Sequence, residues 1–135
     1  MSSILQFLLN FCTFLYETGR FRFVDSAVGP GLSGDAMLVL ESRILRLRFI
    51  RDRGQLFLDM HGLLSKRGDD WYSVDVVQRM LTGKQAISAE LGEQYASFLN
   101  AHLDDIEALF AAERLEETTG TLRKLEHLRA QERLS

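Results

Sequence analysis

Four short runs rich in apolar, branched and aromatic residues occur in the first half of the chain, a pattern typical of β-strands. Glycine, proline, serine and aspartate separate these runs, so we expect a four-stranded antiparallel meander. The predicted strands are Arg20–Val28, Ala36–Glu41, Ile44–Arg51 and Gln55–Met60. The second run is apolar on both faces, which favours a central position in the sheet. The connection Gly29–Asp35 lacks the spacing of a phosphate-binding loop and indicates a simple turn.

The N-terminal stretch is almost wholly apolar, and we expect it to form a helix. Ser2 or Ser3 can cap this helix, which should run to about Thr18 and end at Gly19. Because the segment is apolar nearly all round, Phe11 included, we expect the helix to lie between the sheet and the later helices. The stretch is much shorter than the ~20 residues that span a bilayer, and it lacks the basic segment of a signal peptide. We therefore expect a cytoplasmic protein without a membrane segment.

The second half of the chain has helical periodicity. A short helix is predicted over Val74–Leu81, with Ser73 as its cap and Gly83 as its end, and Trp71 before it should anchor the sheet edge. A long helix is predicted from Ser88. Its buried face repeats at steps of three and four and comprises Leu91, Tyr95, Phe98, Leu99, Leu103, Ile106 and Phe110.

The run Thr118–Thr121 interrupts the helical pattern, and a last helix is predicted over Leu122–Leu134. This helix has few apolar positions, so we expect it to dock loosely or to pair with another chain. The prediction is therefore one α+β domain over residues 1–117, followed by a dispensable helix over residues 118–135. The domain should contain the four-stranded antiparallel meander, an N-terminal helix and a C-terminal helical layer.

Charge is distributed unevenly along the chain. The formal net charge is −3, yet residues 1–67 hold nine Lys/Arg and six Asp/Glu, whereas residues 68–135 hold seven and thirteen. The acidic total argues against nucleic acid as the main ligand. The lone cysteine, Cys12, lies in an apolar run, which favours a buried structural thiol and excludes an intramolecular disulfide.

Candidate acid and base residues gather where the fourth strand ends, namely Asp59, His61, Asp69 and Asp70. A small hydrolase around Asp59 and His61 is one hypothesis. The alternative is that these side chains are simply solvated in a polar loop. Neither a zinc-type histidine spacing nor a catalytic triad can be identified, so we expect no catalytic residue, no metal site and no cofactor.

Five arginines crowd the third strand and its turns: Arg43, Arg46, Arg48, Arg51 and Arg53. With Phe49 and Phe57 nearby, they suggest a small regulatory or nucleic-acid-associated protein that uses this hairpin. The competing interpretation is a partly exposed sheet face on which the arginines pair with Glu41, Asp59 or the acidic helix.

The long helix carries an acidic stripe opposite its apolar face. Eight acidic residues and only one basic residue, Arg114, occur from Glu90 to Glu117. Such a stripe is either a solvated face or a surface that meets a basic protein. The candidate partner-binding residues are Glu90, Glu93, Asn100, Asp104 and Glu107.

The order of these features resembles that of small bacterial immunity proteins from polymorphic-toxin or contact-dependent-inhibition systems. The features concerned are the turn Asp52–Gln55, the pair Trp71–Tyr72 before a short helix, and the acidic amphipathic helix. The resemblance covers about Arg20–Phe110 and assigns no residue a role. It implies a non-enzymatic cytoplasmic protein that binds a cognate toxin and covers its active site.

Overall fold

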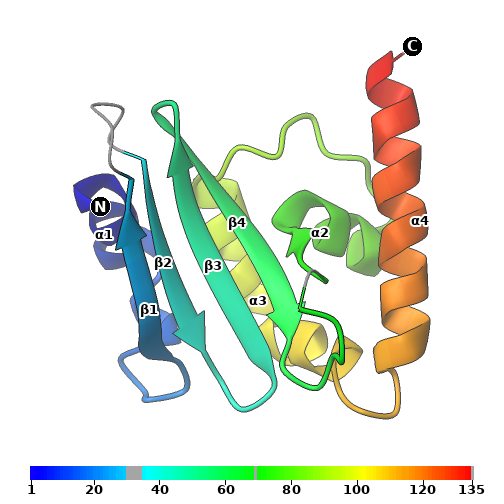
Figure 1. The fold of residues 1–135 in the computed structure, drawn as a ribbon, viewed down its shortest axis with the longest axis horizontal. Helices are drawn as coiled ribbons and strands as arrows, with labels where there is room; N and C mark the ends of the chain where they lie inside the picture. Colours follow the sequence, from blue (N-terminus) through cyan, green and yellow to red (C-terminus); the bar gives the residue numbers. More distant parts are fainter. Residues whose placement is uncertain (30–34, 69, 135) are drawn as a thin grey trace.

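A five-stranded antiparallel sheet organises the protein, with the strands in the spatial order β1-β2-β3-β4-β5 (Figure 1). The computed structural model describes residues 1–29, 35–68 and 70–134. The strands are β1 Arg22–Val28, β2 Ala36–Glu41, β3 Leu45–Asp52, β4 Gln55–Gly62 and β5 Tyr72–Ser73. The α+β class and the antiparallel meander are confirmed. The predicted number of strands was wrong, because two residues are too few to show a sequence period. Most of the Gly29–Asp35 connection lies outside the described residues.

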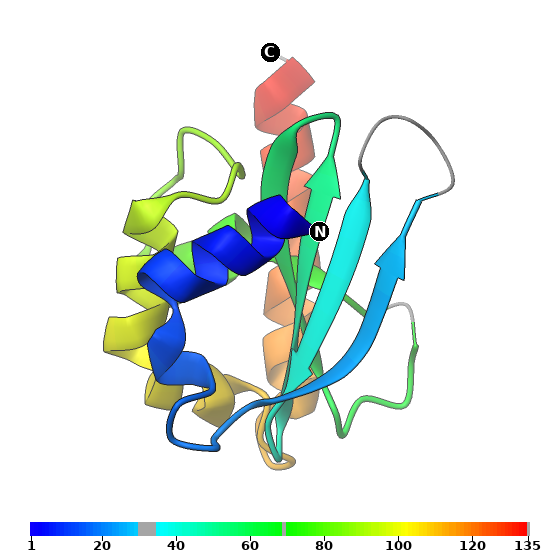
Figure 2. The same ribbon diagram turned by 90° about the vertical axis from the view of Figure 1, so that its left-hand side faces the viewer.

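The register of the sheet separates two faces. Leu40, Leu47 and Met60 lie opposite one another on neighbouring strands, and all three are buried. Helices α1, α2 and α3 cover this apolar face, as the two ribbon views show (Figures 1 and 2). The polar positions that alternate with these residues lie on the opposite face, which is turned toward the viewer in Figure 1.

Strand β1 forms one edge of the sheet and is exposed along its whole length. The register shifts between Phe23 and Asp25, so this strand carries a bulge. The Asp25 carboxylate accepts a hydrogen bond from the Ser26 amide at 2.9 Å. A bulge and a charged side chain bonded to an edge amide are features that discourage further strand pairing.

Helix α1 spans Ser2–Phe11, and a short 3₁₀ turn, Thr13–Leu15, follows it. The predicted single helix to Thr18 was therefore too long. Phe11 was also expected in the core, but it is 40% exposed. The reason is geometric: α1 lies at one side of the molecule and buries a single face, so that Ile4 is buried whereas Leu9 is exposed (Figure 2).

Helices α2 and α3 follow the prediction closely. Helix α2 spans Val74–Thr82 and ends at Gly83, whose φ of 76° is in the left-handed region that favours glycine. Helix α3 spans Glu93–Leu109, a later start than the predicted Ser88, and has a kink at His102. All seven residues predicted for its buried face are buried: Leu91, Tyr95, Phe98, Leu99, Leu103, Ile106 and Phe110.

Helix α4 spans Leu115–Leu134 and packs against α2. The predicted break at Thr118–Thr121 was wrong, because the helix continues through these residues and the break lies before Leu115. Thr118 and Thr119 are buried, and the Thr119 hydroxyl donates a hydrogen bond to a carbonyl one turn back. Packing therefore outweighs the weak helix propensity of this run. The proposed domain boundary after residue 117 falls inside a continuous helix.

Candidate functional site

The acidic face of α3 is the first candidate surface. Glu93, Asn100 and Asp104 are exposed and recur at helical steps on the side opposite the buried residues. Asp104 is 92% exposed at its side chain and forms an ion pair with Arg20 at 2.7 Å. We call Glu93, Asn100 and Asp104 the acidic α3 face. Glu90 precedes the helix and accepts a hydrogen bond from Gln55 at 3.2 Å.

Glu107 differs from the rest of the predicted stripe. Its side chain is only 15% exposed, and its carboxylate forms an ion pair with Arg20 and accepts a hydrogen bond from the Ser42 hydroxyl at 2.6 Å. Burial alone would lower the pKa of Arg20, but hydrogen bonds and charge from Glu107 and Asp104 outweigh it and raise that pKa. Glu107 therefore ties α3 to the sheet, and an exchange at this position would disturb the fold.

Two arginines of the hairpin, Arg46 and Arg48, are paired with carboxylates within the sheet. Arg46 contacts Glu41 at 2.7 Å, and Arg48 contacts Asp59 at 2.9 Å. These are the partners expected for a solvated sheet face. The hydrogen bond from Arg46 is the main reason why the pKa of Glu41 lies below its usual value.

Three further arginines complete the hairpin set, and they do not form one cluster. Arg43 is exposed in the turn between β2 and β3. Arg53 is exposed in the β3–β4 turn at the far end of β3, whereas Arg51 is half-buried on β3. A continuous stripe of unpaired cations, as nucleic acid would require, is therefore not assembled from this set.

Asp59 and His61 lie two residues apart on β4, and each is engaged in a structural contact. Asp59 pairs with Arg48, whereas the Nδ1 atom of the buried His61 lies 3.0 Å from the carbonyl oxygen of Asp70. The Trp71 ring stacks against the His61 ring at 4.9 Å, and the Arg48 guanidinium lies 4.1 Å from the Trp71 ring centroid. This arrangement fixes both candidate catalytic side chains.

Asp70, the remaining described member of the acid and base group, is buried in a hydrogen-bond network; Asp69 lies outside the described residues. The Asp70 carboxylate accepts hydrogen bonds from the Tyr72 hydroxyl and from the Ser65 hydroxyl, the latter at 3.1 Å. Burial would raise the pKa of Asp70, but these bonds and the charge of Arg123 hold it below its usual value. Asp70 is therefore an ionised structural carboxylate.

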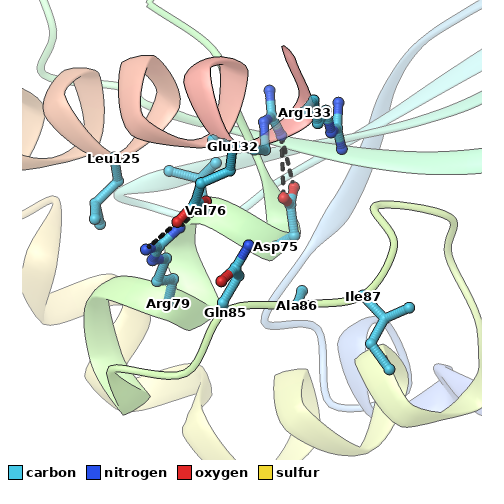
Figure 3. A pocket seen from close by; sticks show the side chains of 10 residues that line it. Asp75, Val76, Arg79, Gln85, Ala86, Ile87, Leu125, Glu132 and Arg133 are labelled. Atoms are coloured by element: carbon cyan, nitrogen blue, oxygen red, sulfur yellow. Dashed lines mark hydrogen bonds and ion pairs between the residues drawn. The ribbon is translucent and has the colours of Figure 1, made fainter. Parts of the chain in front are cut away.

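Two ion pairs across the α2–α4 interface were missed from the sequence. Asp75 pairs with Arg129 at 2.9 Å, and Arg79 pairs with Glu132 at 2.8 Å (Figure 3). They line a cavity of about 110 Å³ beside the exposed Ile87. The sequence did contain an indication of these pairs. Helix α2 carries Asp75 and then Arg79 one turn later, and α4 carries a base and then an acid, Arg129 and Glu132, at a similar spacing. These two ion pairs hold α4 against α2.

Metal-binding clusters and membrane-spanning helices are absent from the described part of the chain. Within it, no group of His, Cys, Asp and Glu side chains could hold a metal ion. None of its helices combines the length and the apolar character needed to cross a membrane. The Cys12 thiol is buried, as expected, and burial raises its pKa to about 12.

The candidate surfaces are therefore one exposed acidic helix face, an arginine hairpin in which Arg46 and Arg48 are paired, and a set of fixed acid and base residues. The fold leaves the acidic α3 face accessible, and it also exposes Arg43 and Arg53 at opposite ends of β3. Comparison of the chain with family models, with curated proteins and with solved structures gave no match.

Proposed function

We propose that this chain is a non-enzymatic protein-binding domain, and that it acts as an immunity-type protein by neutralising a basic toxin domain. The observation that carries the proposal is the acidic α3 face. Its side chains are exposed on a helix whose opposite side is packed into the core. The face is therefore held rigidly, and little conformational entropy is lost when a partner binds.

The distribution of charge supports a basic partner. Glu93 and Asp104 share one face of α3 with the polar Asn100, and Glu90 precedes the helix nearby. Acidic groups arranged in this way accelerate encounter with a positively charged surface, such as the substrate channel of a nuclease. A bacterial toxin that acts on nucleic acid would present such a channel in the cytoplasm.

The engagement of Asp59 and His61 also favours binding over catalysis. A general base needs a free lone pair within reach of a substrate, whereas Asp59 is paired with Arg48 and His61 is buried. A hydrolase centred on these residues would first have to break the Trp71 stack. The proposed activity, by contrast, requires no rearrangement of the fold.

The proposal can be tested with a charge-altered protein that keeps the core contacts. The variant Glu93→Lys/Asn100→Lys changes the acidic α3 face and leaves Arg20, Asp104 and Glu107 untouched. The matched control Glu113→Lys/Glu117→Gln makes the same change in net charge at exposed positions on other elements. Thermal melting establishes first that both proteins fold.

The proteins are then used as bait in lysate from the source cells, and captured proteins are quantified. We expect wild type and control to capture a basic protein that the variant captures at least about tenfold less well, with capture weakening as salt increases. The captured protein should lose its enzymatic activity when mixed with an equimolar amount of wild type. Equal capture by variant and control would refute the acidic α3 face as the binding surface. Binding without inhibition would refute the immunity role.

A further inference from the structure

A second surface, at the start of α4, contains a cavity of about 480 Å³, which lies in the range of small-molecule sites. It is formed by the loop after β4 and by the first turns of α4. We call it the α4 cavity. Its lining residues include Leu64, Lys66, Ala112, Leu115, Thr119 and Arg123.

The walls of the α4 cavity combine an apolar part and a cationic part. Leu64, Ala112 and Leu115 supply apolar surface, and Leu64 remains exposed despite its size. Lys66 and Arg123 are both exposed and bring positive charge to the same cavity. Lys66 belongs to the basic half of the chain and Arg123 to the acidic half, and the fold brings the two side chains to one cavity.

The carboxylate of Asp70, which also lines the cavity, offsets part of this positive charge by pairing with Arg123. It also accepts hydrogen bonds from the Tyr72 and Ser65 hydroxyls, which are neutral and leave its negative charge in place. The Arg123 guanidinium reaches it only at 3.4 Å, a long contact for a charged pair. The guanidinium has five N–H donors, so its contacts with Asp70 and Tyr72 leave others for a further acceptor.

The N-terminus of α4 adds to the same electrostatic preference. Leu115 and Glu116 belong to the first turn of this 20-residue helix and line the cavity. The first amides of a helix carry partial positive charge, which stabilises an anion nearby. Glu116 is exposed and opposes this effect, so the three cationic side chains that line the cavity, Lys66, Arg67 and Arg123, must supply most of the attraction.

We propose that the α4 cavity binds a carboxylate attached to an apolar chain, such as the C-terminus of a polypeptide or a medium-chain acid. The carboxylate lies between Lys66 and Arg123, and the planar guanidinium provides paired donors. The apolar chain packs on Leu64, Ala112 and Leu115. This site is separate from the acidic α3 face, and it selects a ligand of the opposite charge.

The test measures ligand binding by NMR titration, because the single tryptophan, Trp71, packs on His61 and Arg48 and does not line the cavity. The probes are N-acetyl-Leu-Leu with a free carboxylate, its C-terminal amide, octanoate and inorganic phosphate. We expect saturable binding of a carboxylate probe with a Kd between about 10 µM and 1 mM, and binding of the amide at least about tenfold weaker. Tighter binding of the peptide would indicate a polypeptide C-terminus, and tighter binding of octanoate would indicate a free acid.

Two substitutions locate the ligand. Lys66→Gln and Arg123→Gln should each weaken carboxylate binding by about tenfold, whereas Lys124→Gln removes the same charge at the next position of α4 and should leave binding unchanged. Lys66 is exposed, so Lys66→Gln preserves the fold even if Arg123→Gln does not. The proposal is overturned if no probe saturates by about 10 mM, if amide or phosphate binds as well as carboxylate, or if Lys124→Gln has the same effect as Lys66→Gln.

Discussion

Leu122 tests whether α4 belongs to the folded core. Its side chain is fully buried, whereas Leu128 on the same helix is 39% exposed. Leucine and alanine have similar helix propensities, so the same exchange at the two positions differs mainly in lost packing. Truncation of a fully buried leucine to alanine costs about 2–5 kcal/mol, because apolar contacts are lost and a cavity remains. Leu128→Ala should cost less than about 1 kcal/mol.

Urea denaturation followed by circular dichroism measures this difference. With a denaturant slope of about 2 kcal/mol per molar, a loss of ~3 kcal/mol lowers the urea midpoint of Leu122→Ala by roughly 1.5 M. Leu128→Ala serves as the control, and an unchanged slope shows that the whole domain still unfolds in one transition. Equal, small shifts for the two variants would show that α4 lies outside the cooperative unit.

The same reasoning changes the expectation for truncation. The sequence pattern led us to expect that a chain ending at Glu117 would fold. Such a chain would lose Leu122 and would leave the buried Asp75 without Arg129. Because an unpaired buried charge is strongly destabilising, we now expect that this truncation abolishes the cooperative transition.

Four further predictions concern single residues. Asp70→Asn should lower the melting temperature at neutral pH. The pKa of Asp70 is lower in the folded protein than in the unfolded chain, so the ionised carboxylate stabilises the fold at any pH above the unfolded pKa of about 3.9. This stabilisation is lost as the pH falls through the folded pKa. Burial raises the pKa of Glu126, so Glu126→Gln should instead raise the melting temperature at neutral pH. Below about pH 4 the glutamate is protonated in both the folded and the unfolded chain, so the exchange should have no effect there. A change of melting temperature with the same sign in Asp70→Asn and Glu126→Gln would contradict this reasoning. Cys12 should react with a disulfide reagent only as fast as the protein opens, since burial raises its pKa to about 12, and rapid labelling in native buffer would exclude a buried thiol. Gly120→Ala should stabilise the folded protein by about 0.5–1 kcal/mol, because Gly120 lies inside α4 and an added Cβ meets nothing within 4 Å. An unchanged melting temperature would show that the helix does not run through this position.

The local pattern of the chain determined most of the secondary structure. A continuous apolar run identified β2, alternation identified most of the three other long strands, and helical spacing identified the buried face of α3. Gly83 was a reliable helix end because its left-handed φ is a local requirement. The exposure of Glu93, Asn100 and Asp104 also followed from spacing, since a helix that buries one face must expose the other.

Contacts between distant residues decided the rest. Glu107 shares the spacing of the acidic α3 face, but Arg20 and Ser42, far away in the sequence, bring its carboxylate into the fold. Strand β5 exists because β4 pairs with it, and two residues have no detectable period. Helix α4 passes through Thr118–Thr121 because its packing outweighs propensity. Intrinsic preferences amount to less than about 1 kcal/mol per residue, so tertiary burial can reverse them wherever a segment meets the core.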